Sequence, residues 1–340
     1  MLHEKGLLPR SVDPTEDGGT GVGRTDLRGM KKKHHGLRRF PILSGTIERI
    51  RATLFFPLLL SLAGCAHQLG LPLNPPPTEI RVATYNTHFF GKHDASHPDG
   101  KDSAAVLADI AQLTTTLGID VWMFQEAYRS LAPNPNPYPT NHLQRILEVL
   151  PGWQGVYSQM KVEGAFSKGT IIAWNALMFE PVGLPIALQW QAGNSTSDPK
   201  GGVAQILRRL QDSKEVLIVC VHFDTGVNVV TRKKQAQEAV AKLTSALTAY
   251  ATLLQTPPAQ LPWIFGGDLN TAFGRSEPCY RYLVNDLGMD SAIDFTVRTH
   301  IAGMQLDHLL AKGLSALGAD VRYEANDSDH FPVIASFDLP

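Results

Sequence analysis

The sequence predicts an α/β domain in which mixed β-sheets pack face to face and helices cover their outer faces. From residue 79 onward, short runs of β-branched and aromatic residues alternate with segments of helical periodicity. The composition of residues 79–340 shows no break, and no internal repeat is present. These observations favour a single domain over this range.

The predicted strands are short apolar runs bounded by polar, Gly or Pro residues. They comprise Ile80–Tyr85, Val121–Gln125, Trp153–Gln159, Thr170–Trp174, Ala204–Leu210, Val216–Phe223, Trp263–Phe265, Gln305–Leu310 and Pro332–Phe337. Two segments repeat apolar residues at helical spacing and predict helices at Ser103–Leu117 and Thr231–Leu254.

Composition excludes a disordered or fibrous chain, because 43% of the 340 residues are hydrophobic and 19% are charged. The net charge of −1 is unevenly distributed. Residues 1–77 contain 11 Lys and Arg against 6 Asp and Glu, whereas residues 78–340 contain 20 against 26. A net-negative domain argues against broad electrostatic binding of nucleic acid. The overall charge does not exclude a local basic groove.

The N-terminal segment contains one strongly apolar run, Ala52–Gly64, preceded by Arg49 and Arg51. It is too short for a comfortable membrane span and predicts the core of a signal peptide. The run ends in Leu62-Ala-Gly-Cys65, which resembles the bacterial lipobox, in which the cysteine becomes the lipidated first residue. The alternative is a buried apolar segment that ends at a chance cysteine.

Residues 1–64 are therefore interpreted as a signal peptide with an N-terminal extension, and translation is expected to start at Met30 or later. Residues 65–78 are Pro-rich and predict a tether between a lipid and the folded domain. We expect the protein to be anchored by lipid outside the cytoplasm, in the bacterial cell envelope, and to be a monomer. Cys220 and Cys279 remain after lipidation, too few for a disulfide framework or a zinc site. Whether they pair is left open.

Polar residues follow several predicted strands directly, and strand ends are where rigid scaffolds place reactive groups. They are Asn86, Glu126, His222, Asp268 and Asn270. Taken singly, each has a structural explanation, because Asn and Asp end strands and cap turns. Taken together, they suggest a site at one edge of the sheets.

Six motifs occur in a characteristic order: Ala83-Thr-Tyr-Asn86, Gln125-Glu126, Val221-His-Phe223, Gly266-Gly-Asp-Leu-Asn270, Leu306-Asp-His308 and Ser328-Asp-His-Phe-Pro-Val333. Through them the chain resembles the endonuclease/exonuclease/phosphatase superfamily of magnesium-dependent phosphoesterases, from Val82 to Val333. The fourth and sixth motifs are the most specific. The resemblance implies a four-layer α/β sandwich with its site at one end of the two sheets.

Hydrolysis of a phosphate ester needs neutralised phosphoryl oxygens, an in-line water and a stabilised leaving oxygen. Glu126 and Asp329 offer hard oxygen ligands, and Asn86 would complete their shell, so we expect Mg²⁺ or Mn²⁺ as cofactor. By resemblance, Asp268 orients or deprotonates the attacking water, and Asn270, on the same Gly-flanked turn, holds a phosphate oxygen.

The resemblance also assigns Asp307 as the partner that fixes the tautomer of His330, giving a pair that serves as base or phosphate clamp. His222 is expected to donate to the phosphoryl oxygens from the opposite side. Lys168 is a candidate for substrate binding, and a solvated lysine is the alternative. Arg232 and Gln235 are weaker candidates for residues of the site. Two loops either rim the site or are ordinary surface loops: one contains His88, His93 and His97, and the other is Ala132–Asn141.

The sequence thus predicts a metal-dependent hydrolase of phosphate esters. Nucleic acid, a sphingomyelin-type headgroup, an inositol phosphate and a nucleotide all stay open as substrates, because a fold does not fix a substrate. The net-negative domain and the predicted anchor favour a small or lipid-borne ester over duplex DNA. The alternative is a catalytically inactive binding or scaffold lipoprotein, which would be expected to have lost a charged ligand; here every expected polar position is filled.

Overall fold

A computed structural model describes residues 78–88, 103–130, 141–163, 166–191, 200–225, 229–294 and 296–340. The predicted signal peptide, Cys65 and all of the predicted tether except Thr78 lie outside these ranges, as do His93, His97 and residues 132–140. Within the described residues, no helix is both long and apolar enough to cross a membrane.

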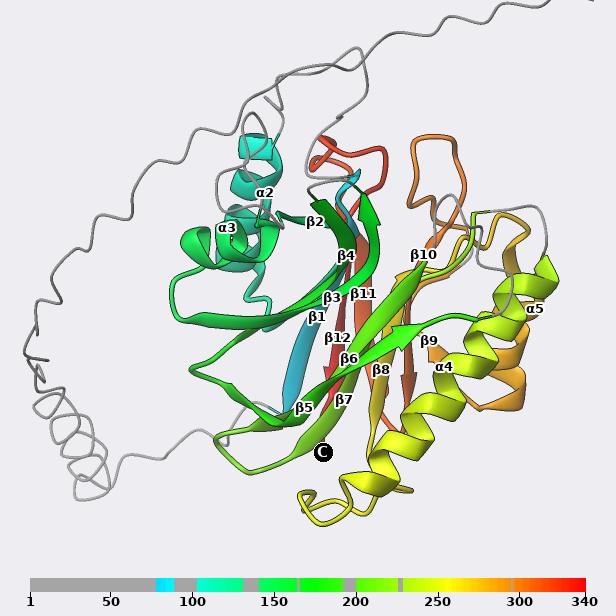
Figure 1. Cartoon of the computed structure of the whole chain (residues 1–340). Coiled ribbons are helices and arrows are strands. Elements are labelled where there is room, and N and C mark those ends of the chain that lie inside the picture. Colours follow the sequence, from blue (N-terminus) through cyan, green and yellow to red (C-terminus); the bar gives the residue numbers. More distant parts are fainter. Residues whose placement is uncertain are drawn as a thin grey trace, which may run out of the picture. The chain divides into compact units, whose positions relative to one another are not determined.

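The described residues form two six-stranded sheets (Figure 1). In spatial order, the first contains β11 (Ser315–Val321), β12 (Val333–Asp338), β1 (Glu79–Asn86), β2 (Val121–Ser130), β4 (Phe166–Asn175) and β3 (Trp153–Glu163). The second contains β5 (Phe179–Gln189), β6 (Gly201–Arg209), β7 (Glu215–His222), β8 (Trp263–Asp268), β10 (Asp307–Lys312) and β9 (Asp290–Ser291). Each sheet has one parallel pair, β1 with β2 and β7 with β8, and its other pairs are antiparallel.

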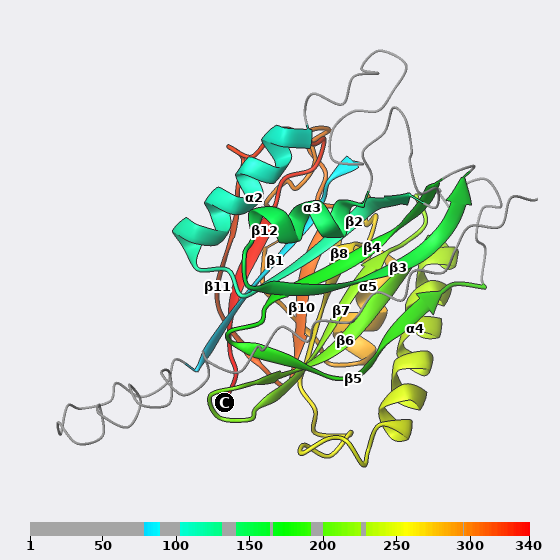
Figure 2. The same ribbon diagram turned by 60° about the vertical axis from the view of Figure 1, so that its left-hand side comes forward.

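Helices cover the outer face of each sheet (Figures 1 and 2). The helices α2 (Ser103–Leu117) and α3 (His142–Val149) lie on the first sheet. The second sheet carries α4 (Val229–Ala249) and α5 (Pro278–Arg281), with short helical turns at Gly274–Ser276 and Tyr282–Asp286. The four-layer α/β sandwich predicted from the sequence is confirmed.

The core has three layers because each central strand is apolar on both faces. In β1, Ile80 and Val82 point between the sheets, whereas Ala83 and Tyr85 point toward α2, and all four are buried. Fully burying a side chain such as Val82 contributes roughly 1.5–3 kcal/mol. The central layer therefore clamps the two sheets together and fixes how their ends meet.

The strands predicted from apolar runs are all present, with ends shifted by a few residues. The elements not predicted are α3, α5, β5, β9, β11 and the two short helical turns. Alternation in β5 is broken by a register shift between Val182 and Ile186, and six of the seven residues of β11 are exposed, so neither shows a clear period. The helix α4 ends at Ala249 rather than Leu254, because the following chain turns so that Gln255 and Thr256 donate to Glu215.

The two remaining cysteines do not pair. Both Cys220 and Cys279 are buried free thiols. Cys220 lies in the core between the sheets, whereas Cys279, a residue of α5, lies in the apolar layer between the second sheet and its helices. The question left open by the sequence is thus answered by their placement in different layers.

Glu215, the first residue of β7, connects three segments through its buried carboxylate. It accepts hydrogen bonds from Arg208 Nη2 (2.6 Å) and from the backbone N–H groups of Gln255 (3.0 Å) and Thr256 (2.8 Å). Burial alone would raise the pKa of this carboxyl, but the Thr256 and Gln255 N–H groups and the Arg208 guanidinium outweigh burial and lower it. The ionised form therefore stabilises the fold.

We expect E215Q to lower the free energy of unfolding at pH 7 by about 1.5–3 kcal/mol, the range for hydrogen bonds to a charged group. Because the folded pKa is lowered, this stability is present above the unfolded pKa of about 4.3 and is lost as pH falls through the folded pKa. Urea unfolding should show the two proteins converging below about pH 4. The matched control is E180Q, which removes a more exposed partner of Arg208 and should cost less than about 1 kcal/mol. Equal losses in both variants would contradict this account.

Candidate active site

Polar side chains meet where the parallel strands of both sheets end. His222 and Asp268 are the last residues of β7 and β8 and lie opposite each other in parallel register. Asp307, the first residue of β10, pairs with Asp268 in antiparallel register. Asn86 ends β1 in the other sheet. Three neighbouring strands of one sheet and one strand of the other therefore contribute to a single cluster.

Asp268 is at the centre of this cluster and is only 2% exposed. Its Oδ2 accepts a hydrogen bond of 2.9 Å from Asn86 Nδ2, across the two sheets. The same oxygen lies 3.4 Å from His222 Nε2 and 3.8 Å from His330 Nε2. Its Oδ1 accepts the backbone N–H of Asn270 at 2.9 Å. The Asp268 carboxylate is thus surrounded by donors and imidazoles.

Asp307 and His330 form a buried pair, with 2.7 Å between Asp307 Oδ2 and His330 Nδ1. The backbone N–H of Asp307 donates to Thr299 Oγ1. Its second oxygen, Oδ1, has no hydrogen-bond partner. The two residues paired in the sequence analysis are therefore in contact, while their catalytic role stays a prediction.

Burial and neighbouring charges set the protonation of the cluster. Burial lowers the pKa of His330, but the Asp307 carboxylate outweighs burial and raises it to about 10. Burial raises the pKa of Asp268 to about 6, against the opposing effect of His330. Burial, together with Lys200 and other cations, holds the pKa of His222 well below its usual range. At neutral pH, His330 is an imidazolium, His222 is neutral, and Asp268 can accept a proton near pH 6.

The end of β8, just before the turn, needs a glycine. Gly267 has φ +126°, and a Cβ there would lie 2.0 Å from the Val221 carbonyl oxygen. Asn270 adopts φ +52° and donates its side-chain amide to the Phe223 carbonyl at 2.9 Å. The turn therefore brings Asp268 and Asn270 to one edge, with one amide N–H of Asn270 holding the chain that follows β7.

Glu126 does not follow the end of a strand, as the sequence analysis expected, because β2 continues to Ser130. The register with β4 shifts between Phe124 and Ala127, and Glu126 has φ +57°. Such a bulge re-aims one side chain, and a non-Gly residue at positive φ costs on the order of 1 kcal/mol or more, a strain that clusters at functional sites. Glu126 Oε1 lies 3.7 Å from Lys200 Nζ and 3.8 Å from His222 Nε2.

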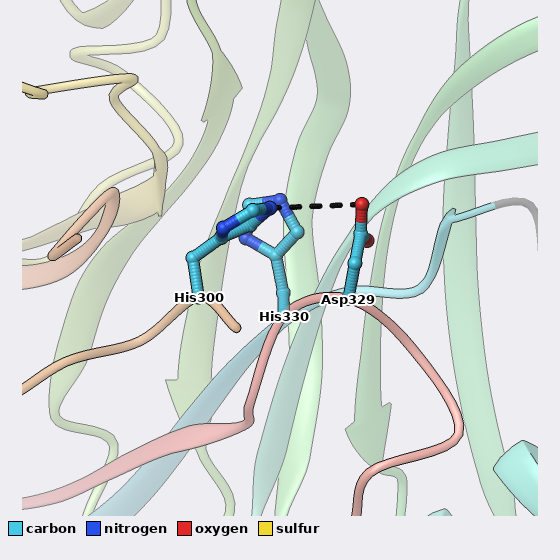
Figure 3. A group of neighbouring side chains, drawn as sticks. All are labelled: His300, Asp329 and His330. Carbon is cyan, nitrogen blue, oxygen red and sulfur yellow. Dashed lines mark ion pairs between the residues drawn. The ribbon is translucent and has the colours of Figure 1, made fainter. Parts of the chain in front are cut away.

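Asp329 lies between two imidazoles. Its Oδ1 is 3.4 Å from His88 Nδ1, and its Oδ2 is 3.6 Å from His300 Nε2, the contact drawn in Figure 3. Burial alone would raise the pKa of Asp329, but His300, His330 and His88 lower it to about 2. This carboxylate is therefore ionised at any physiological pH.

Two groups of His and Asp among the described residues have ligand atoms within 4.8 Å of one another: Asp268, Asp307 and His330, and His300, Asp329 and His330. Glu126 belongs to neither, so the structure does not gather the predicted ligands Asn86, Glu126 and Asp329 into one such group. Their chemistry nevertheless fits a hard cation, because Glu126 and Asp329 present carboxylate oxygens whose polar contacts within the described part of the chain are all 3.4 Å or longer.

The supporting residues fall into two sets. Lys168 on β4 has its Nζ 5.9 Å from the Tyr128 ring, and its charge contributes to lowering the pKa of His222, which places it near the cluster. Arg232 instead pairs with buried Glu277 at 2.8 Å and donates to the Asp224 carbonyl. Gln235 accepts the Asp224 N–H at 2.9 Å. These contacts of Arg232 and Gln235 fix the segment that follows His222.

Sequence reasoning missed Lys200 and His300. Lys200 precedes β6 and is only 6% exposed, and His300 lies in an irregular segment whose backbone bridges His330. No strand end or motif marks either residue. Both reach the cluster through long-range contacts that spacing along the chain does not report.

A model of the endonuclease/exonuclease/phosphatase family matches residues 83–330. This chain belongs to that family. Its members are mostly hydrolytic phosphoesterases and are generally dependent on divalent metals. The match spans the cluster from Asn86 to His330.

Solved structures share the fold at low identity. A family member from Beutenbergia cavernae is 16% identical, with a TM-score of 0.58, over 77% of this chain and 72% of that one. The human Nocturnin catalytic domain is 17% identical (TM-score 0.57; 78% and 96% covered), and a mannosyl-6-phosphatase of Bacteroides thetaiotaomicron is 18% identical (TM-score 0.57; 76% and 99%). No curated protein matches the chain.

Proposed function

We propose that this chain is a divalent-metal-dependent hydrolase of phosphate esters that works by in-line attack of an activated water. The observation that carries the proposal is the Asp268 carboxylate, which contacts Asn86 from the opposite sheet and lies beside both His222 and the Asp307–His330 pair. An inactive scaffold would not be expected to keep these buried charges, which cost free energy of folding.

In this proposal, Asp268 orients the attacking water and takes its proton, for which a pKa of about 6 is suited near neutral pH. His330, held as an imidazolium by Asp307, clamps a phosphoryl oxygen. His222 is neutral and donates one N–H from the end of β7, and Asn270 holds a further oxygen. Lys168 adds positive charge for an anionic substrate, and we add Lys200, which lies near Glu126.

Glu126, Asn86 and Asp329 would hold the Mg²⁺ or Mn²⁺. When bound, the cation neutralises charge on the non-bridging oxygens and stabilises the leaving oxygen. The bulge at Glu126 supports this assignment, because it turns a carboxylate toward the cluster at a cost in backbone strain.

For the substrate, we favour a small or lipid-borne phosphate ester over duplex DNA. The net-negative charge of residues 78–340 and the proposed lipid anchor support this choice. The mannosyl-6-phosphatase that shares the fold acts on a monoester, so a monoester belongs beside diesters in the assay. Activity with magnesium against plasmid DNA, sphingomyelin, a chromogenic phosphodiester and a sugar phosphate would decide among them.

Hydrolysis should disappear in excess EDTA and return with Mg²⁺ or Mn²⁺. Glu126→Gln should lower kcat/KM by about 100-fold or more, because it removes the charge of a proposed ligand while keeping its shape. The matched control E180Q, on β5, should retain activity. Full activity in EDTA, or in E126Q, would refute metal dependence through Glu126.

Asp307→Asn should lower kcat about 100-fold with little change in KM, because His330 loses the carboxylate that orients it and supports its charge. His330→Ala should cost more. The double variant should be hardly worse than H330A, since residues that act as a unit are strongly non-additive. Steady-state kinetics of the three variants checks this, and multiplying losses would show that the two residues act independently.

We also propose that the mature protein starts at Cys65 and is held in the bacterial cell envelope by its lipid, outside the cytoplasm. The support is the motif Leu62-Ala-Gly-Cys65 at the end of the apolar run Ala52–Gly64. Cys65→Ser should abolish processing and move the protein out of the membrane fraction, as followed by immunoblot of fractionated cells. Unchanged processing and fractionation would show that Cys65 is not the anchor.

A further inference from the structure

The segment that carries His300 is tied to the segment that carries Asp329. The Ile301 N–H donates to the Asp329 carbonyl (2.9 Å), and the Phe331 N–H donates to the Thr299 carbonyl (2.8 Å). The His300 segment closes on itself through the Gly303 N–H, which donates to the His300 carbonyl. Backbone pairing therefore fixes the position of the His300 backbone relative to that of Asp329.

The tautomer of His300 follows from one hydrogen bond. The backbone N–H of Ala302 donates to His300 Nδ1 at 3.0 Å. This nitrogen must keep its lone pair, so the ring proton is on Nε2. Nε2 lies 3.6 Å from Asp329 Oδ2, and Figure 3 shows the ring and the carboxylate facing each other.

This tautomer decides between two interpretations of the group formed by His300, Asp329 and His330, whose ligand atoms lie within 4.8 Å of one another. In the first, the group binds a transition metal. With its proton on Nε2, His300 has no lone pair to offer a metal from the nitrogen that faces Asp329. The second interpretation, in which His300 is a donor aimed at Asp329, agrees with the position of Nε2 opposite Asp329 Oδ2.

We propose that His300 is a positioning residue that orients the Asp329 carboxylate for the divalent cation. This inference rests on the proposed function. Asp329 Oδ1 faces His88 and Ser328 Oγ, each at 3.4 Å, whereas Oδ2 faces His300 and keeps a further lone pair for a cation. A contact of 3.6 Å is longer than a hydrogen bond, and such contacts often tighten only in the loaded site.

The His300 ring has a second contact that an experiment must separate from the first. It packs edge-on against the His330 ring, with 4.7 Å between centroids and 80° between planes. His300→Phe keeps an aromatic ring of similar shape but removes the donor. His300→Gln keeps a donor but removes the ring. The two variants therefore distinguish the effect of the N–H donor from the effect of ring packing.

The test measures the affinity of the full chain for Mn²⁺ alone, without substrate, from the EPR signal of free Mn²⁺. Removing an outer partner of a metal ligand typically costs 10–100-fold in affinity, which we expect for H300F. H300Q should lose less. The matched control is R298A, which alters the same segment at a residue that stacks on Tyr323 and Phe331, and it should bind Mn²⁺ as the wild type does.

Wild-type affinity in H300F, or an equal loss in H300Q and H300F, would overturn the donor role. If H300F does not fold, as judged by thermal unfolding, H300M replaces it, because methionine also has side-chain bulk without a donor. E126Q separates this inference from the proposed function. If E126Q binds Mn²⁺ normally, the proposed metal site itself fails, whereas loss in E126Q with normal binding in H300F refutes only the inference.

Discussion

The hydrogen bond from Asn86 to Asp268 joins the two sheets at the end where the polar cluster lies, and the rest of the cluster depends on it. It forms only because the central layer holds β1 and β8 at a fixed separation, through side chains such as Val82 and Ile264. Packed interiors resist small displacements. Burying apolar surface between the sheets thus sets the positions of the charged groups at their end.

The cluster concentrates negative charge in a place from which water is largely excluded. Asp268 and Asp307 are almost fully buried, and Asp329 is partly buried. Each has a compensating neighbour: His330 for Asp307, Asn86 for Asp268, and the imidazoles of His88 and His300 for Asp329. Glu126 instead faces Lys200 at 3.7 Å, so each of these four carboxylates has at least one polar or cationic neighbour.

The sequence predicted the centre of the fold better than its periphery, because the central strands are apolar on both faces while the missed elements are not. Strand β11 is exposed along most of its length, and β5 contains a register shift that hides its alternation. Asn86, His222 and Asp268 were placed at strand ends, where the structure has them. The sequence also placed Glu126 after a strand, which is wrong, because Glu126 lies in a bulge within β2 that depends on the pairing with β4 and leaves no local pattern.

Lys200 and His300 were missed for a similar reason, because their roles depend on contacts between distant segments of the chain. A buried lysine beside a carboxylate is understandable only once β6 lies beside β7, and His300 only once its segment pairs with Asp329. The family motifs include Asp307 and Asp329, whereas Lys200 and His300 lie outside every motif. A single backbone hydrogen bond, from the Ala302 N–H, is enough to set the tautomer of His300.

The buried charges of the site also lower the stability of the folded protein. A buried ion pair seldom stabilises a protein more than apolar groups of similar volume, and a positive φ at Glu126 adds strain. The three apolar layers must offset both costs. A chain without catalytic use for Asp268, Asp307 and Glu126 would gain stability by replacing them, and their joint presence at one end of the sheets is therefore physical support for a functional site rather than a structural one.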